Sequence, residues 1–391
     1  MVSLRDVESC REEAENYFKH LHRFPELGFE EHATSDFIAQ ELQSFGLEKI
    51  RTGVGKTGVT GDLLVHSNAK MLMLRADMDA LPLHEASGLD YASTVSGKMH
   101  ACGHDAHVAM LLGAARYLSL HREKLRANIR FVFQPAEEGP MPGGAALMIE
   151  AGVMEGVSAS LAAHVTPLYP VGKVMVQSRD AMASTDRFVI TIRGRGGHGA
   201  MPQAAIDPTP ALSELLAALN LLPARELDPL DPCVVTVGEI HTVSSSWNVI
   251  PGSVEMSGTF RAFSTEVRET VARRIGELTE GICSAHRCEC EYFRDKGYHP
   301  TVNDPKMVDF VLKNVADALG KDNAVRYERP FMTGEDAGAY FRKAPGALIW
   351  IGCSSPEAKD PPNLHNPAFR VDLATLPVGI CVHVSNALAF A

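Results

Sequence analysis

The feature that most constrains the fold is an alternation of strand and helix patterns that is interrupted once and then resumes. Apolar runs typical of buried strands occur at 58–65, 71–75, 128–133 and 158–164. Helical patterns lie between them, the clearest over 105–120, which is rich in alanine and leucine. Strands that alternate with helices predict an α/β domain with a mixed, mostly parallel sheet.

The interruption has a different order of elements. From about residue 181 the pattern becomes strand, helix, strand, strand, helix, strand, at 187–193, 210–222, 233–241, 253–263, 265–286 and 288–294. This order is typical of a ferredoxin-like α+β unit. The earlier style then returns, with a helix over 305–319 and a strand over 346–352. We therefore predict a catalytic domain formed by 1–180 and 297–391, with a smaller domain inserted at 181–296.

Composition excludes several classes of protein. The 391 residues carry a net charge of −11 without a basic block, which argues against nucleic acid as a partner. No apolar run approaches the ~20 residues that span a bilayer, so no membrane association is expected. The first twenty residues lack the pattern of a signal peptide. The eight cysteines offer no clear disulfide pair, so we expect reduced thiols and a cytoplasmic location.

Side chains suited to metal ions follow several of the predicted strands. The segments concerned read LRADMDALP at 74–82, HACGHDAH at 100–107, FVFQPAEEG at 131–139, and PPNLHNP at 361–367, and His164 ends the strand at 158–164. The carboxyl ends of strands are where open α/β sheets place their active sites. The convergence of thiol, imidazole and carboxylate groups at one edge therefore predicts a metal site.

Two other classes of protein remain as alternatives. Residues 194–199 read GRGGHG, which fits the dinucleotide-binding pattern and would indicate an oxidoreductase. Pro202 and Pro208 delay the helix that such a site requires, so these glycines more simply form a loop that presents His198. A metal-binding or dimerisation protein without catalysis is the second alternative, although Glu137 and Glu138 follow a strand end as a pair that would supply one ligand and one general base.

The ordered motifs ADMDALP, HACGHDAH, FQPAEEG, IRGRGGHGAMP, NVIPG and LHNP closely resemble those of the aminoacylase-like dinuclear metallopeptidases. The branch that they resemble contains the hippurate hydrolases and the indoleacetyl-amino-acid hydrolases, which are N-acyl-L-amino-acid amidohydrolases. The resemblance covers nearly the whole chain. It implies hydrolysis of N-acyl or N-aroyl amino acids to a carboxylate and a free amino acid. A dipeptidase or carboxypeptidase with the same machinery remains the alternative.

The resemblance also implies the roles of the site residues. Two divalent metal ions per subunit would share Cys102, with His104 and His164 completing one metal site and Glu138 and His365 the other. Glu137 would be the general base. A bridging thiolate favours zinc, and manganese remains possible because the other ligands are imidazole and carboxylate. Most relatives have histidine where this chain has Asp77, whose role is left open. Asp79 is interpreted as orienting a ligand imidazole.

The inserted domain is expected to contribute to the reaction as well. By the resemblance, the domain at 181–296 is a lid and dimerisation domain. The chain would form a homodimer through it, and His198 would reach the oxyanion in the partner subunit's site. Asn248 and Arg261 are candidates for holding the substrate carboxylate, since arginine suits bidentate carboxylate binding.

Overall fold

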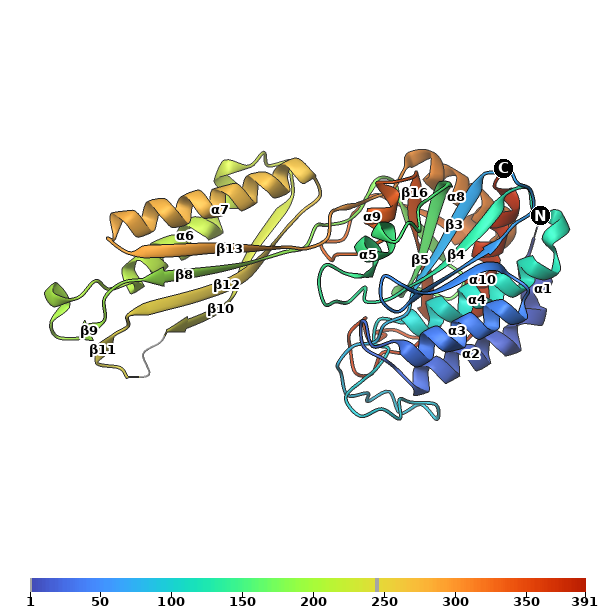
Figure 1. The fold of residues 1–391 in the computed structure, drawn as a ribbon, viewed down its shortest axis with the longest axis horizontal. Helices are drawn as coiled ribbons and strands as arrows, with labels where there is room; N and C mark the ends of the chain where they lie inside the picture. The colour runs from blue at the N-terminus through green and yellow to red at the C-terminus, as the bar shows by residue number, and fades with distance from the viewer. Residues whose placement is uncertain (1, 243–245) are drawn as a thin grey trace. The chain divides into compact units, whose positions relative to one another are not determined.

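The computed structural model describes residues 2–242 and 246–391. The chain forms two compact units (Figure 1). The first contains Met1–Ala181, Val302–Pro330 and Asp336–Ala391, and the second contains Met182–Thr301 and Phe331–Glu335.

The first unit is built on an eight-stranded sheet. Its strand order is β1-β2-β4-β3-β5-β16-β6-β15. The central strands β4, β3, β5 and β16 run parallel, while β1, β2 and the β16–β6 pair add antiparallel contacts. The strands span β1 Glu48–Val54, β2 Gly58–Leu63, β3 Met71–Asp77, β4 Asn128–Gln134, β5 Val157–Pro170, β6 Val174–Gln177, β15 Ala324–Tyr327 and β16 Gly346–Ser354. Strands β3 and β16 are buried along their whole length, which explains their nearly continuous apolar runs.

Helices enclose this sheet. Helix α4 packs against α2, α10 and β3, so almost all of its side chains are buried. Helices α5 and α9 pack together near β4, β5 and β16 (Figure 1). The α-helices are α1 Leu4–Val7, α2 Arg11–Arg23, α3 His32–Ser44, α4 His104–Leu120, α5 Gly144–Glu150, α8 Pro305–Leu319, α9 Gly338–Phe341 and α10 Thr375–Ala389, with 3₁₀ turns at Glu8–Cys10, Arg122–Lys124 and Lys321–Asn323.

The second unit has its own core. Its antiparallel sheet has the order β10-β12-β8-β13, and α6 and α7 pack on one face of it (Figure 1). Alternate residues of β8, among them Phe188, Ile190 and Ile192, point into that core. The elements are β8 Asp186–Arg193, β9 Gly197–His198, a 3₁₀ turn Pro202–Ala204, α6 Thr209–Glu226, β10 Cys233–Thr242, β11 Val249–Ile250, β12 Ser253–Ala262, α7 Thr265–Ala285 and β13 Glu289–Lys296. Short strands β7 Asp180–Met182 and β14 Thr301–Val302 pair with each other where the chain passes between the units.

The predicted fold class is confirmed: an α/β unit with a mixed, mostly parallel sheet accompanies a unit with ferredoxin-like strand order. At the N-terminus, a 3₁₀ turn at Glu8–Cys10 separates α1 from α2. The spacing of three residues in that turn lets both Val7 and Cys10 point into the core. Within the described residues, the search for a helix with the length and apolarity of a membrane span finds none.

Candidate metal centre and active site

The candidate site lies where several strands of the first unit end. Cys102 and His104 flank Gly103 at the start of α4. His164 does not end its strand, as the sequence predicted, because β5 continues beyond it to Pro170. Gly103 has a left-handed φ of 85°, and a Cβ there would lie 2.4 Å from Cγ2 of Val165. Only glycine fits this turn, which therefore places the thiol and the imidazole on one side of the helix start.

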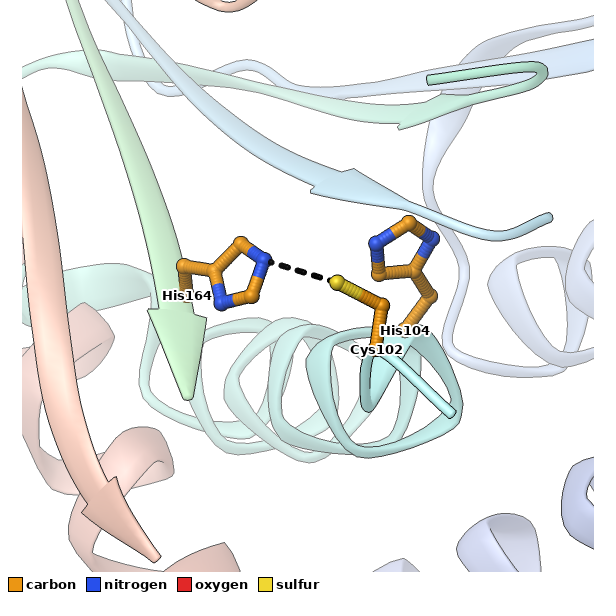
Figure 2. Close-up of side chains that lie close together, drawn as sticks. All are labelled: Cys102, His104 and His164. Atoms are coloured by element: carbon orange, nitrogen blue, oxygen red, sulfur yellow. Dashed lines mark hydrogen bonds between the residues drawn. The ribbon is translucent and has the colours of Figure 1, made fainter. Parts of the chain in front are cut away.

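The first set of donor atoms comes from Cys102, His104 and His164, whose ligand atoms all lie within 4.8 Å of one another. Figure 2 shows the three side chains converging, with Sγ of Cys102 3.5 Å from Nε2 of His164. Nδ1 of His164 lies 2.7 Å from the carbonyl oxygen of Val165, which places the ring proton on Nδ1. Nε2 of His164 therefore presents its lone pair towards the thiol.

His104 is arranged in a similar way. Its Nδ1 lies 3.2 Å from Oδ1 of Asp79, while its buried Nε2 has no hydrogen-bond partner among the described residues. A fully buried nitrogen without a partner is costly. A metal ion at Nε2, with the carboxylate of Asp79 fixing the other nitrogen, would satisfy both ring atoms.

The second set of donor atoms comes from Cys102, Glu138 and His365, again within 4.8 Å of one another. Nε2 of His365 lies 2.7 Å from Oε1 of Glu138. The side chain of His365 is 52% exposed, and its left-handed backbone is held by a hydrogen bond from its N–H to the carbonyl oxygen of Ala101. Cys102 belongs to both sets, so its sulfur would be common to two ions if both sets held one.

A third group, formed by Asp77, His104 and His107, is less available to a metal. Nε2 of His107 accepts the N–H of Val165 at 2.8 Å, and its Nδ1 lies 2.5 Å from Oδ1 of Asp77. Both ring nitrogens are thus already in hydrogen bonds. Asp77 is in turn held by the buried guanidinium of Arg75 at 2.7 Å. The place of Asp77, which the sequence left open, is therefore between a buried arginine and two histidines.

The charges of the site favour added cations. Burial and the nearby carboxylates of Glu138, Glu137 and Asp77 raise the pKa of the Cys102 thiol well above its usual value. Burial lowers the pKa of His104, but the neighbouring Asp77 and Asp79 outweigh burial and raise it to about 10. A thiolate among these carboxylates is stable only when positive charge accompanies it. The donor set therefore fits a pair of divalent metal ions.

Glu137 is buried and stands beside the donor sets. Its carboxylate lies within 4.8 Å of the ligand atoms of His104 and Glu138. The backbone N–H of Glu137 donates to Oδ1 of Asp79 at 3.0 Å, and that of Glu138 donates to Oδ2 at 2.9 Å. Asp79 thus contacts a candidate ligand imidazole and fixes the backbone of both glutamates.

The remaining predicted site residues lie in the second unit. His198 in β9 pairs with Val249 in β11, and the N–H of Gly199 donates to the carbonyl oxygen of Asn248 at 2.8 Å. His198 and Asn248 are therefore neighbours, both exposed. Arg261 lies on β12, and its buried Nη1 has no hydrogen-bond partner among the described residues. The structure thus brings the five candidate metal ligands, Glu137 and Asp79 together in one unit, and His198 and Asn248 together in the other.

Buried polar residues of the first unit that the sequence analysis did not identify also surround the site. Arg75 holds Asp77, and His22 lies 2.6 Å from Oδ2 of Asp105, the residue after His104. An arginine inside a buried strand was a signal for the first of these. His22 and Asp105 are 83 positions apart, so nothing local indicated their contact.

The fold and the donor sets are those of a candidate dinuclear metal enzyme. A family model described as peptidase family M20/M25/M40 matches residues 73–388. IAA-amino acid hydrolase ILR1-like 4 of Arabidopsis thaliana is 40% identical over 95% of this chain and 84% of its own. N-acyl-L-amino acid amidohydrolase of Geobacillus stearothermophilus is 41% identical over 76% of this chain and 80% of its own. The crystal structure of a Bacillus subtilis dinuclear metal binding peptidase from the M20 family has a TM-score of 0.83 and 32% identity, and covers 97% of this chain and 98% of that one. The chain belongs to peptidase family M20/M25/M40.

Proposed function

We propose that the protein hydrolyses the amide bond of N-acyl or N-aroyl amino acids, releasing a carboxylate and a free amino acid. The observation that carries the proposal is the pair of donor sets that share Cys102, with the buried carboxylate of Glu137 beside them. The similarity to a protein named as an N-acyl-L-amino acid amidohydrolase supports this choice of substrate.

Two divalent metal ions per subunit complete the proposed site. Cys102, His104 and His164 would hold one ion, and Cys102, Glu138 and His365 the other. Bound divalent ions lower the pKa of water and polarise the amide oxygen. The shared thiolate favours zinc over manganese, because thiolate is a soft ligand.

Glu137 is the proposed general base. Its carboxylate accepts the proton of the attacking water and passes it to the departing nitrogen of the amide. Glu138, the adjacent residue, belongs to a donor set, so one glutamate would act as base and the other as ligand. Asp79 accepts the backbone N–H groups of both residues and thereby fixes their positions.

The second unit is proposed to act as a lid that binds the substrate. Nδ1 of His198 accepts the N–H of Ala200 at 3.0 Å, so the ring proton of the neutral imidazole lies on Nε2. That N–H is available to an oxyanion, and such a donor contributes about 3–4 kcal/mol to the transition state. The unpaired Nη1 of Arg261 supports a role for this arginine, with Asn248, in holding the substrate carboxylate.

We also propose a homodimer formed through the second unit. Strand β10 is an edge of its sheet, and Val234 and Ile240 on this strand are exposed. Trp247, close to His198, is 97% exposed. Exposed edges and apolar side chains of this kind are typical of association surfaces. His198 would serve the partner subunit's site.

All eight cysteines are free thiols, which supports a cytoplasmic location.

A hydrolysis screen tests the proposed activity. The metal-loaded protein is assayed on N-acetyl, N-benzoyl and indoleacetyl amino acids, with dipeptides and C-terminally extended peptides beside them. Release of free amino acid from the acylated substrates is expected. Preference for the peptides would establish the alternative, a dipeptidase or carboxypeptidase, and no hydrolysis of any substrate would refute the proposal.

Elemental analysis tests the metal centre. We expect about two divalent ions per chain, and loss of metal in Cys102→Ser and His104→Ala. Cys353→Ala removes a buried thiol from β16 and serves as the matched control that keeps the metal. Undiminished metal in both site variants would contradict the ligand assignment.

Mixing two inactive variants tests the exchange of His198 between subunits. In a mixed dimer of His198→Ala and Glu137→Gln, one site carries both defects and the other neither, provided that each site takes its histidine from the partner. Activity should then return after subunit exchange. If mass measurements confirm exchange but no activity returns, His198 acts within its own subunit.

A further inference from the structure

The residue before the proposed general base has an unusual backbone. Ala136 has a φ of 49°, and it is fully buried. A non-glycine residue rarely adopts this left-handed conformation unless its surroundings hold it there. Because Ala136 directly precedes Glu137, the direction of the Glu137 side chain depends on whatever maintains this turn.

Glu31, from a distant part of the chain, contacts the backbone of Ala136. This residue precedes α3 and is fully buried. Its Oε1 accepts the backbone N–H of Ala136 at 2.9 Å, and its Oε2 accepts the hydroxyl of Thr57 at 2.6 Å. The carboxylate therefore ties the loop after β4 to two other segments of the first unit.

The segment that carries Glu31 also lies in direct contact with this loop. A Cβ on Gly28 would lie 1.9 Å from the carbonyl oxygen of Gly139 and 3.0 Å from Cβ of Ala136. Glycine at position 28 is thus required for the approach. On the other side, the carbonyl oxygen of Ala136 accepts the N–H of Gly144 at 3.1 Å. Both polar backbone groups of Ala136 are held.

The contacts form a continuous clamp over three successive amides. Glu31 accepts the N–H of Ala136, and Asp79 accepts those of Glu137 and Glu138. Asp79 also contacts His104, whereas no contact of Glu31 with a candidate metal ligand is found among the described residues. The two carboxylates therefore share the loop but differ in their relation to the metal centre.

We propose that Glu31 is a positioning residue for the hydrolytic reaction: it holds Ala136 in the left-handed conformation and thereby aims Glu137 at the water. This inference rests on the proposed function of Glu137. The part that Glu31 plays is that of a hydrogen-bond acceptor. Burial, the largest influence on this carboxyl, raises its pKa to about 7, which agrees with a role that does not depend on full charge.

Three variants separate this role from general stability. Glu31→Met keeps the length of the side chain but offers the amide no strong acceptor. Glu31→Gln keeps an acceptor oxygen for Ala136. Thr57→Val, the matched control, removes the other contact of Glu31 and leaves the bond to Ala136 in place. For each we measure kcat, KM, metal content and hydrogen–deuterium exchange of the peptide covering 131–143.

We expect Glu31→Met to lose at least about tenfold in kcat, with KM and metal content nearly unchanged, and to exchange faster in the 131–143 peptide. Glu31→Gln and Thr57→Val should remain within about threefold of the parent kcat and keep the exchange protection. Should Glu31→Met fail to fold, Glu31→Asp replaces it, because the shortened carboxylate withdraws from Ala136 and should show the same pattern.

Two results would overturn the inference. One is unchanged kcat and protection in Glu31→Met or its replacement. The other is a loss in Glu31→Gln equal to that in Glu31→Met, which would show that charge rather than the hydrogen bond matters. The exchange measurement needs no substrate, so it tests the hydrogen bond from Ala136 to Glu31 independently of activity. Failure to hydrolyse any acylated amino acid would refute only the proposed function.

Discussion

Each unit of the molecule contains one fully buried arginine, and the two are used differently. Arg75 in β3 of the first unit contacts Gln134, Asp77 and Asp336 at 2.7–2.9 Å. Arg268 in α7 of the second unit contacts both carboxylate oxygens of Asp186, at 2.6 and 3.1 Å.

The difference lies in what the carboxylate partners touch next. Oδ1 of Asp77 lies 2.5 Å from Nδ1 of His107, and its Oδ2 lies 3.7 Å from Nε2 of His104. Among the described residues, the side chain of Asp186 contacts one further side chain, Arg294, whose Nε lies 2.9 Å from Oδ1 of Asp186. A buried ion pair is therefore not by itself a sign of function. The role of each network depends on the residues at its end. In the first unit these include His104, a candidate metal ligand. In the second unit they join α7 to β8 and β13.

The largest effect is expected from a substitution that removes the proposed general base and leaves both buried arginine networks in place. Glu137→Gln keeps the shape of the side chain but cannot accept a proton, so turnover should fall by about 100- to 10,000-fold while metal content stays constant. The matched control is Glu239→Gln in the second unit, a carboxylate that accepts only the hydroxyl of Ser257 among the contacts found. Steady-state kinetics with metal analysis of the same samples decides, and near-normal turnover of Glu137→Gln would contradict its role.

Replacing the arginines themselves tests the contrast directly. Arg75→Met and Arg268→Met each remove a buried guanidinium from its carboxylate partners. Arg75→Met should lower the free energy of unfolding by about 3–5 kcal/mol, and Arg268→Met by somewhat less, because Asp186 keeps its contact with Arg294. Only Arg75→Met should also weaken metal binding, because its partner Asp77 lies against His104, a candidate metal ligand. Urea denaturation of the metal-free proteins gives the first quantity and competition with a chelator gives the second. Equal metal affinity in the two variants would remove the distinction.

A third prediction concerns His22, which joins the start of α4 to the loop before it. Burial lowers the pKa of His22, but hydrogen bonds with Asp105 and Glu85 outweigh burial and raise it to about 9 from 6.5. The stabilisation is therefore complete below about pH 6.5 and is lost as the pH rises through about 9, with a total of about 3 kcal/mol. Denaturation at a series of pH values should show this loss in the parent and a flatter curve in His22→Gln. A parallel decline in both would assign the loss to other groups.

The smallest effect is expected at the surface. Arg193 and Glu291 form an ion pair at 2.9 Å across β8 and β13 of the second unit, and their side chains are 44% and 69% exposed. Arg193→Ala should change the unfolding free energy by less than about 1 kcal/mol and leave metal binding unchanged. A loss comparable to that of Arg268→Met would mean that exposure does not separate the two kinds of pair.

The fold was largely predictable because the hydrophobic periodicity of the elements and their order along the chain are visible in the sequence. Buried and exposed residues alternate along strands of the second unit such as β8. Helix α10 was missed because nearly all of its residues are buried, so its apolar side chains show no amphipathic period.

For the site, most candidate ligands were identified because they lie in compact motifs that follow strands, although His164 lies within β5. The supporting residues were not. Glu31 reaches a loop 105 positions away, and the contact of Arg75 with Asp336 spans 261 positions. Such contacts depend on tertiary packing, which a reading of local pattern does not contain. The roles of the ligands and of His198, Asn248 and Arg261 remain predictions for the experiments above.

The pairing of β5 with β16 places Trp350 opposite His164, with ring centroids 4.9 Å apart. The chain has only one other tryptophan, Trp247, and the two differ sharply in exposure, at 4% and 97%. In a separated subunit, a water-soluble quencher such as iodide therefore reaches one indole and not the other. The emission that survives quenching comes from the indole that lies against a candidate metal ligand, so the protein contains its own fluorescent reporter of the state of the centre.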